Sequence, residues 1–253
     1  MITFKDVAVG YQNKAVLKNI NFSLPSGSLT ALAGPNGCGK TTLLRAAARQ
    51  LPLLSGGITY GGKNLAAFGQ KEFARTAAYM PQARNIPDIT VEEMVRHGRF
   101  PHLGLMRHLT RRDYDLVEQA LDKLGIAAWR DCRLANLSGG ERQLVYLALV
   151  LAQESPVLLL DEPTTYLDIT NQFKVMGLLQ FLAAEGKTIL VVLHDLAAAL
   201  QYCQQIALLD QGQLAALVSP EQIYRQQLLR SILGVQVGRD QEGVYYLKPN
   251  TLG

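Results

Sequence analysis

Cysteine is scarce in this sequence. Its 253 residues include three cysteines, Cys38, Cys132 and Cys203, which lie far apart and form no Cys-x-x-Cys pair. A disulfide framework needs an even set of cysteines, and a cysteine-based zinc site needs closely spaced pairs. We therefore expect neither, and this cysteine usage fits a reducing compartment best.

Long apolar runs are also lacking. The longest, about Leu144 to Ala152, is well short of the roughly 20 residues that a membrane-spanning helix needs. The first residues, 1–6, show no basic segment followed by an apolar one, so no signal peptide is visible. We expect a soluble chain whose membrane role, if it has one, depends on a partner.

Charge of one sign does not dominate. Lys and Arg number 25 against 21 Asp and Glu, which gives a net charge of +4. This small, dispersed excess does not by itself imply nucleic acid, although it suits a phosphate-rich ligand or an acidic lipid surface. Hydrophobic residues make up 48% of the chain and charged residues 18%, which excludes a disordered protein.

The order of apolar patterns predicts one α/β unit with a helical insertion. Two fully apolar runs, at 157–160 and 188–193, are typical of strands buried on both faces of a parallel sheet. The other predicted strands are 2–9, 20–24, 29–33, 58–60 and 205–210. The predicted helices are 41–50, 91–97, 111–124, 142–153 and 171–184, with another opened by Ser219 as N-cap.

A glycine-rich loop follows the predicted strand 29–33. Residues 34–41 fit the pattern Gly-x4-Gly-Lys-Ser/Thr, which in a strand–loop–helix context is typical of a phosphate-binding loop. Its glycines allow backbone N–H groups to surround the β- and γ-phosphates, Lys40 reaches the same phosphates, and the Thr41 hydroxyl ligates Mg²⁺. The residues that we expect to bind the nucleotide here are Gly34, Pro35, Asn36, Gly37, Cys38, Gly39, Lys40, Thr41 and Thr42.

Two carboxylates end the strand at 157–160. Asp161 is placed to hold Mg²⁺ opposite Thr41. Glu162 lies at the carboxyl end of the strand, where ligands bind in open α/β sheets, and is placed to activate water. Taken alone, these two residues would be better interpreted as solvated acids of a loop. Because they follow a phosphate loop in the sequence, we favour the functional interpretation.

The segment Leu137-Ser138-Gly139-Gly140-Glu141 precedes a helical pattern. Ser138 is an N-cap, and the two glycines expose N–H groups at a helix N-terminus, which makes an anion site. A plain capped helix start explains the spacing equally well.

The order of these motifs, with Gln82 before the Ser-Gly-Gly segment and His194 after the last buried strand, resembles the ATP-binding subunit of ABC transporters over essentially the whole chain. The resemblance implies a P-loop NTPase (RecA-like) α/β fold with a mostly parallel core sheet, an N-terminal antiparallel β subdomain and an α-helical subdomain. It implies a single ABC ATPase domain over 1–253, with the helical subdomain at about 84–155. It also implies ATP and Mg²⁺ as ligands.

In that family two subunits pair head to tail, and each ATP lies between the phosphate loop of one chain and the Ser-Gly-Gly segment of the other. The resemblance therefore implies a homodimer in which Ser138, Gly139 and Gly140 contact nucleotide in trans. Two residues depart from the family pattern: Glu141 replaces the usual Gln, and Leu144 replaces a second basic residue. Both bear on the strength of the trans contact.

The resemblance also implies roles for single residues. Tyr11 is similar to the aromatic residue that stacks on adenine, and Asp168 to the residue that ties the two ATP sites together. Gln82 is similar to the residue that contacts Mg²⁺ and the attacking water and senses the membrane partner. His194 is similar to the histidine that contacts the γ-phosphate. The expected catalytic set is Glu162, His194, Lys40 and Gln82, and the expected metal ligands are Thr41, Gln82 and Asp161.

Two segments narrow the resemblance. His97-Gly98-Arg99-Phe100-Pro101-His102 and Thr164-Thr165-Tyr166-Leu167-Asp168-Ile169 resemble ATPase subunits of bacterial importers for iron chelates, haem and cobalamin. The implied partners are a polytopic permease and, indirectly, a substrate-binding protein, on the cytoplasmic face of the inner membrane. The favoured cargo is an Fe(III)-siderophore or ferric citrate, and no nucleic-acid partner is expected.

Three alternatives stay open. They are the ATPase subunit of an ABC exporter, a non-transport ABC ATPase acting on nucleic acid or ribosomes, and a small-molecule P-loop kinase, which leaves Leu-Ser-Gly-Gly unexplained. Arg107, Arg111 and Arg112 suit a solvated face, with contact to acidic lipid or to the membrane partner as the alternative.

Overall fold

Six strands form the central sheet of the computed structural model, which describes residues 1–82, 86–104 and 108–250. The pairs from β9 through β3, β8 and β7 to β6 are parallel, and β10 joins β9 antiparallel, so the mostly parallel core sheet is confirmed. In sheet order the strands are β10 (Gln213–Val218), β9 (Gln205–Asp210), β3 (Leu29–Ala33), β8 (Thr188–Val192), β7 (Val157–Asp161) and β6 (Ala77–Met80).

Both faces of this sheet are covered, which explains its continuous apolar strands. Leu158 and Leu160 of β7 belong to a core that includes residues of the helices α5 (Gly139–Ala152), α6 (Ile169–Ala184) and α7 (Leu196–Tyr202). The alternate residue Leu159 belongs to a second core, formed with α1 (Lys40–Ala47) and the N-terminal strands. The carboxyl ends of β3 and β7 therefore lie between two packed layers.

A second, antiparallel sheet carries the N-terminus, as predicted. Its order is β2 (Lys14–Leu24), β1 (Ile2–Tyr11), β4 (Leu53–Tyr60) and β5 (Lys63–Asn64). The predicted strands 20–24 and 58–60 were too short. Gly56 and Gly57, which the predicted strand 58–60 excluded, lie inside β4. Gly56 has φ +78°, and a Cβ atom there would overlap the carbonyl of Asp6, at a point where Asp6 and Val7 of β1 both oppose Gly56.

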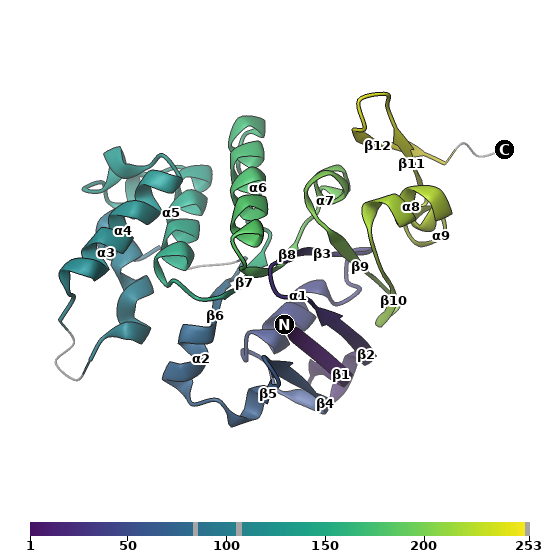
Figure 1. The fold of residues 1–253 in the computed structure, drawn as a ribbon, viewed down its shortest axis with the longest axis horizontal. Coiled ribbons are helices and arrows are strands. Elements are labelled where there is room, and N and C mark those ends of the chain that lie inside the picture. Colours follow the sequence, from purple (N-terminus) through teal and green to yellow (C-terminus); the bar gives the residue numbers. More distant parts are fainter. Residues whose placement is uncertain (83–85, 105–107, 251–253) are drawn as a thin grey trace.

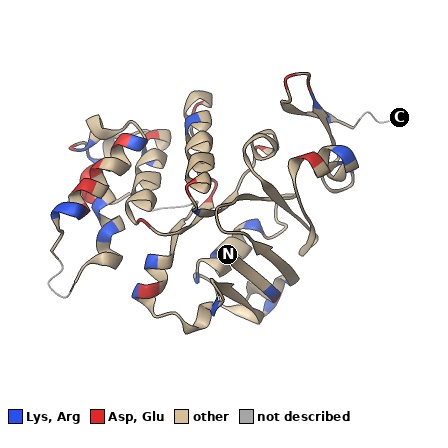
Figure 2. Ribbon diagram, viewed as in Figure 1, with Lys and Arg blue, Asp and Glu red and all other residues tan. Residues whose placement is uncertain are grey.

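The helices between β6 and β7 gather on one side of the molecule, far from the C-terminal hairpin (Figure 1). They are α3 (Val91–Arg96), the 3-10 helix η2 (His97–His102), α4 (Arg111–Lys123), two short 3-10 helices, η3 (Ala127–Trp129) and η4 (Leu134–Asn136), and α5. Lys and Arg alternate with Asp and Glu along this group, so neither sign of charge forms a continuous face in this view (Figure 2). Arg84, where we placed the start of the insertion, and Arg107 lie outside the described residues.

Several predicted boundaries were wrong because capping side chains, rather than apolar periodicity, begin the helices. Ser138 caps α5, as predicted, so this helix starts at Gly139 rather than at 142, where its apolar pattern begins. Asp168 caps α6, which starts at Ile169 rather than at 171. Helix α1 ends at Ala47, before the predicted residue 50. The helix that we predicted to begin after Ser219 is α8 (Pro220–Gln226). Several elements were not predicted: β5, β6, β10, η1 (Leu65–Ala67), α2 (Gln70–Thr76), α9 (Leu228–Leu233), and the hairpin of β11 (Val235–Arg239) and β12 (Tyr245–Pro249).

None of the helices in the described ranges combines the length and the apolar character that crossing a bilayer requires.

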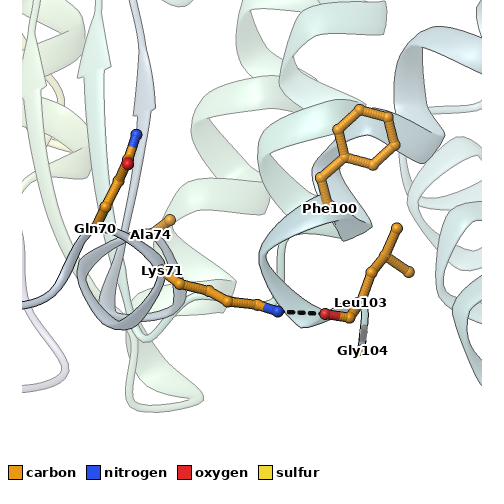
Figure 3. Close-up of a pocket in the computed structure, with 6 residues that line it drawn as sticks. All are labelled: Gln70, Lys71, Ala74, Phe100, Leu103 and Gly104. Carbon is orange, nitrogen blue, oxygen red and sulfur yellow. Dashed lines mark hydrogen bonds between the residues drawn. The ribbon is translucent and has the colours of Figure 1, made fainter. Parts of the chain in front are cut away.

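Helix η2 is fixed to the C-terminal end of α5. A Cβ atom at Gly98 would overlap the carbonyl oxygen of Leu149, so the two helices approach as closely as a glycine allows. The buried guanidinium of Arg99 donates to Asp113 Oδ1 at 2.9 Å and to the carbonyl of Ala152 at 2.7 Å. The end of η2 also contacts α2: Lys71 donates to the carbonyl of Leu103, and both residues line a hollow of about 700 Å³ (Figure 3).

We expect Gly98→Ala to lower the free energy of unfolding by about 1–3 kcal/mol, because the added methyl group must push η2 away from α5. Chemical denaturation of the purified chain measures this. The control is Gly104→Ala, where the new Cβ atom meets no atom of the described residues within 4 Å and stability should be unchanged. Equal stability of the two variants would contradict the close packing of η2 on α5.

Candidate nucleotide site

The glycine-rich loop between β3 and α1 is pressed against the end of β9. Gly34 has φ +148°, and a Cβ atom there would overlap the carbonyl oxygen of Leu209. Gly39, at φ +105°, precedes α1 in a left-handed conformation that favours glycine. The loop therefore presents its backbone N–H groups at the N-terminus of α1, the arrangement that binds phosphate.

Lys40 lies inside the loop. Its Nζ donates to the carbonyls of Gly34 at 2.9 Å and Pro35 at 3.0 Å, and the side chain is buried. Cys38 Sγ is 4.0 Å from the same nitrogen. Burial raises the pKa of the Cys38 thiol, an effect that the Lys40 charge partly opposes, so this cysteine is a neutral packing residue rather than a nucleophile.

Asp161 lies opposite Thr41, as predicted. Thr41 Oγ1 donates to Asp161 Oδ1 at 3.0 Å, and the carboxylate is fully buried. Burial raises the pKa of Asp161, while the hydrogen bond from Thr41 lowers it and the charge of Glu162 raises it. Asp161 Oδ2 is buried and has no hydrogen-bond partner among the described residues. A buried, unpaired carboxylate oxygen beside a threonine hydroxyl fits the oxygen-rich ligand set that a hard divalent cation prefers.

We expect Asp161→Asn to stabilise the nucleotide-free chain by about 0.5–2 kcal/mol, because it removes a buried charge and keeps an acceptor for Thr41. The same variant should lose most of the increase in melting temperature that Mg²⁺ and ATP produce together in the natural chain. Thermal melts with and without both ligands measure the two effects. Asp122→Asn, on the exposed face of α4, is the control; a destabilised Asp161→Asn chain would contradict the burial argument.

Glu162 and His194 face each other across the end of the sheet. His194 Nε2 lies 2.6 Å from Glu162 Oε1, and Thr165 Oγ1 donates to Glu162 Oε2 at 3.2 Å. Glu162 is buried, whereas the His194 side chain is 53% exposed. Both residues line a cavity of about 190 Å³ together with the phosphate loop residues Asn36, Gly37, Gly39, Lys40, Thr41 and Thr42. The structure thus brings the predicted loop, acid and histidine into one small cavity, although larger hollows exist elsewhere.

The Ser-Gly-Gly segment stands apart from this cavity. Ser138 Oγ accepts from the N–H of Glu141 at 3.3 Å, and Glu141 Oε2 accepts from the N–H of Ser138 at 2.7 Å. These hydrogen bonds lower the pKa of Glu141, so the residue that departs from the family pattern serves as the second half of a capping box. Among the described lining residues of the phosphate-loop cavity, none belongs to 138–140.

Three more predicted residues, Tyr11, Gln82 and Asp168, do not line this cavity. Tyr11 is 44% exposed beside α1, where Arg45 Nη1 donates to its hydroxyl at 3.5 Å. Gln82 lines a separate hollow of about 280 Å³ together with Gly139 and Tyr166. Asp168 Oδ1 accepts from the N–H of Asn171 at 2.8 Å as the N-cap of α6.

Two residues that touch Glu162 were not predicted. Thr165 contacts its carboxylate, and Gln143 Nε2 donates to its backbone carbonyl at 2.8 Å. Gln143 lies two residues after Glu141 in a conspicuous motif, but no spacing rule indicates that its side chain turns toward β7.

Comparisons with known proteins give one consistent result. The model of the family described as "ABC transporter" matches residues 17–165. The ferric enterobactin transport ATP-binding protein FepC of Escherichia coli (strain K12) is 38% identical over 234 residues, which cover 92% of this chain and 86% of that protein.

Solved structures agree. A putative metal-chelate type ABC transporter in an inward-facing conformation superposes with a TM-score of 0.82 at 26% identity, covering 98% of this chain and 96% of that one. The dimeric post-hydrolysis state of the ATP-binding cassette MJ0796, bound to ADP and Pi, gives a TM-score of 0.78 at 25% identity, covering 87% and 99%.

Proposed function

The chain belongs to the ABC transporter family as an ATP-hydrolysing subunit, and from this premise we propose that its phosphate-loop cavity powers the uptake of an iron chelate through a separate membrane permease. The observation that carries this proposal is the convergence of Lys40, Glu162 and His194 on one cavity at the end of a parallel sheet. The chemistry of each group at that place suits transfer of a phosphoryl group to water.

In the proposed reaction Glu162 acts as the general base. Its carboxylate accepts a proton from the attacking water while the water oxygen bonds to the γ-phosphorus and the bond to the bridging oxygen of ADP breaks. His194, 2.6 Å from Glu162 Oε1, orients that carboxylate and contacts the γ-phosphate. The Lys40 ammonium neutralises phosphate charge, and the loop N–H groups bind the remaining oxygens.

Thr41, Asp161 and Gln82 are the residues that would hold Mg²⁺, and the unpaired Oδ2 of Asp161 supports this assignment. When bound, the ion neutralises charge on the β- and γ-phosphate oxygens. Tyr11, exposed at the end of β1 and beside Arg45 of α1, is the residue we assign to the adenine ring.

A second copy completes the site. Ser138, Gly139 and Gly140 stand at a helix N-terminus outside the cavity of their own chain, so they are available to the nucleotide of a partner. Asp168 at the start of α6 belongs to the segment that we assign to the contact between the copies. Dimeric cassettes among the solved relatives support this pairing.

We also propose that 1–253 is one ABC ATPase domain with a helical subdomain at about 84–155. The pair of ATPase subunits is peripheral on the cytoplasmic side of the membrane, which we assign to a bacterial inner membrane, and it binds a polytopic permease and, indirectly, a substrate-binding protein. The name of FepC and the 97–102 segment support an Fe(III)-siderophore or ferric citrate cargo.

The test is transport by the reconstituted complex. The chain is purified with its permease in vesicles together with a binding protein loaded with Fe(III)-catecholate, Fe(III)-hydroxamate, ferric citrate, haem or cobalamin. ATP hydrolysis is measured with each cargo, and uptake is followed by ⁵⁵Fe for the four iron cargoes and by radioactive cobalt for cobalamin. The proposal expects stimulation and uptake with one of the first three. Stimulation by haem or cobalamin alone, or transport in the opposite direction, would overturn it.

A further inference from the structure

Gln143 of α5 is hydrogen-bonded to Glu162, the residue that follows β7. We propose that Gln143 is a positioning residue for Glu162, through which the first turn of α5 (residues 138–141, here the signature turn) controls the carboxylate that activates water. The proposal rests on the proposed function of Glu162 and adds a link between the two ATP sites of the pair.

The hydrogen bond is built into the core. The Gln143 side chain is 6% exposed, and its Nε2 donates to the backbone carbonyl of Glu162 at 2.8 Å. The same carbonyl accepts from the N–H of Thr165 at 3.3 Å. Because Gln143 is buried, water does not readily replace its N–H donor, so removing that donor alters the support of Glu162 directly.

Glu162 needs such support because its backbone is in an unusual conformation. Its φ is +54°, in the left-handed region that non-glycine residues seldom occupy and that persists only where surrounding contacts hold it. On one side the N–H of Glu162 donates to the carbonyl of Val192 at 3.1 Å, and on the other the carbonyl accepts from Gln143. These two bonds fix both adjoining peptide groups and thereby aim the carboxylate at His194.

The signature turn packs against the loop that follows Glu162. A Cβ atom at Gly140 would lie 2.7 Å from the carbonyl oxygen of Tyr166, and one at Gly139 would lie 3.7 Å from the Tyr166 Cβ. Tyr166 itself has φ +70°. The start of α5 thus contacts the end of this loop, at Tyr166. Gln143 contacts the start of the same loop, at Glu162, and lies about 7.5 Å further along the helix axis than Ser138.

These contacts connect two different nucleotides. In the proposed pair, Ser138 contacts ATP bound by the partner, whereas Glu162 of the same chain lines the cavity of its own phosphate loop. A helix moves as a rigid unit, so seating Ser138 on one nucleotide sets the position of Gln143 and, through it, the carboxylate at the other. Occupancy of one site therefore prepares hydrolysis at the other.

The test compares Gln143→Met with Leu147→Met in the full chain. Both place the same side chain at buried positions of α5, but Leu147 lies in the hydrophobic core and only the first change removes the donor to Glu162. We expect Gln143→Met to lower kcat roughly ten- to a hundredfold, with the Kd for ATP unchanged and the Hill coefficient for ATP reduced toward 1. Leu147→Met should keep all three values. A natural kcat in Gln143→Met, or a loss of kcat that Leu147→Met shares, would overturn the proposal.

The same change made in the Glu162→Gln variant tests the role of Gln143 separately from the role of Glu162. With Glu162→Gln, adding Gln143→Met should cause no further loss of hydrolysis and leave ATP-driven pairing intact, because no base remains to be positioned. A further loss in the double variant would assign Gln143 a purely structural role and overturn the proposal. Natural turnover by Glu162→Gln alone would instead remove the proposed function of Glu162, a different and distinguishable failure.

Discussion

Replacing Glu162 with Gln is expected to slow ATP hydrolysis by roughly 10²–10⁴-fold while ATP still binds. Glutamine has the same shape and can keep the contacts to Thr165 and His194, but its amide does not accept the proton of the attacking water. In the proposed mechanism ATP stabilises the closed pair and only hydrolysis removes the γ-phosphate, so the variant should accumulate as an ATP-bound dimer. Phosphate release gives the rate, and gel filtration with and without ATP gives the association state.

The matched control is Glu185→Gln, the same chemical change on an exposed residue just after α6. This control should hydrolyse ATP at the natural rate and should not accumulate as a dimer. Turnover by Glu162→Gln within a few-fold of the natural chain would contradict the role of general base.

Replacing Lys40 with Ala is expected to weaken ATP binding at least a hundredfold, to the point where binding is not detected. The buried Nζ is held 2.9 Å and 3.0 Å from two loop carbonyls, so the charge is already in place when the phosphates arrive, in surroundings where charge–charge attraction is stronger than in water. Titration calorimetry with ATP measures the loss, and the melting temperature of the variant should no longer rise with the nucleotide.

Lys40→Met keeps most of the buried stem and should lose ATP binding equally, which separates the lost charge from lost packing. Lys174→Ala, on the exposed face of α6, is the control and should bind ATP normally. Unchanged affinity in Lys40→Ala would count against the phosphate loop as the nucleotide site.

Local sequence patterns were sufficient for the parallel sheet and for the motifs along its edge. Strands β3, β7 and β8 consist entirely of buried residues, and each is followed by residues of the site. Strand β6 was missed because its four residues, Ala77–Met80, show no pattern of their own and become a strand by pairing with β7. Strand β4 was predicted too short because Gly56 and Gly57 look like a turn in the sequence, whereas they lie inside the strand, where its register with β1 is irregular.

The residues of the candidate site likewise divide into those that the sequence predicts and those that only the structure shows. Lys40, Thr41, Asp161 and Glu162 are found from spacing because each lies at a fixed offset from a strand or helix end. Gln143 was missed because its role depends on a contact with a residue 19 positions away in the sequence. Glu141 is a third case: the sequence shows only that it departs from a family pattern, whereas the structure shows the hydrogen bonds that its carboxylate makes.

The close approach of Gly98 to Leu149 has a mechanical consequence. Helix α5 has 14 residues and is about 21 Å long, with Ser138 at its first turn and η2 attached near its last. Arg99 ties η2 to the last residue of α5, and no loop intervenes between that junction and the serine. A protein that displaces η2 therefore also displaces α5 as a rigid helix. The displacement reaches Ser138, at the opposite end of that helix, with little loss.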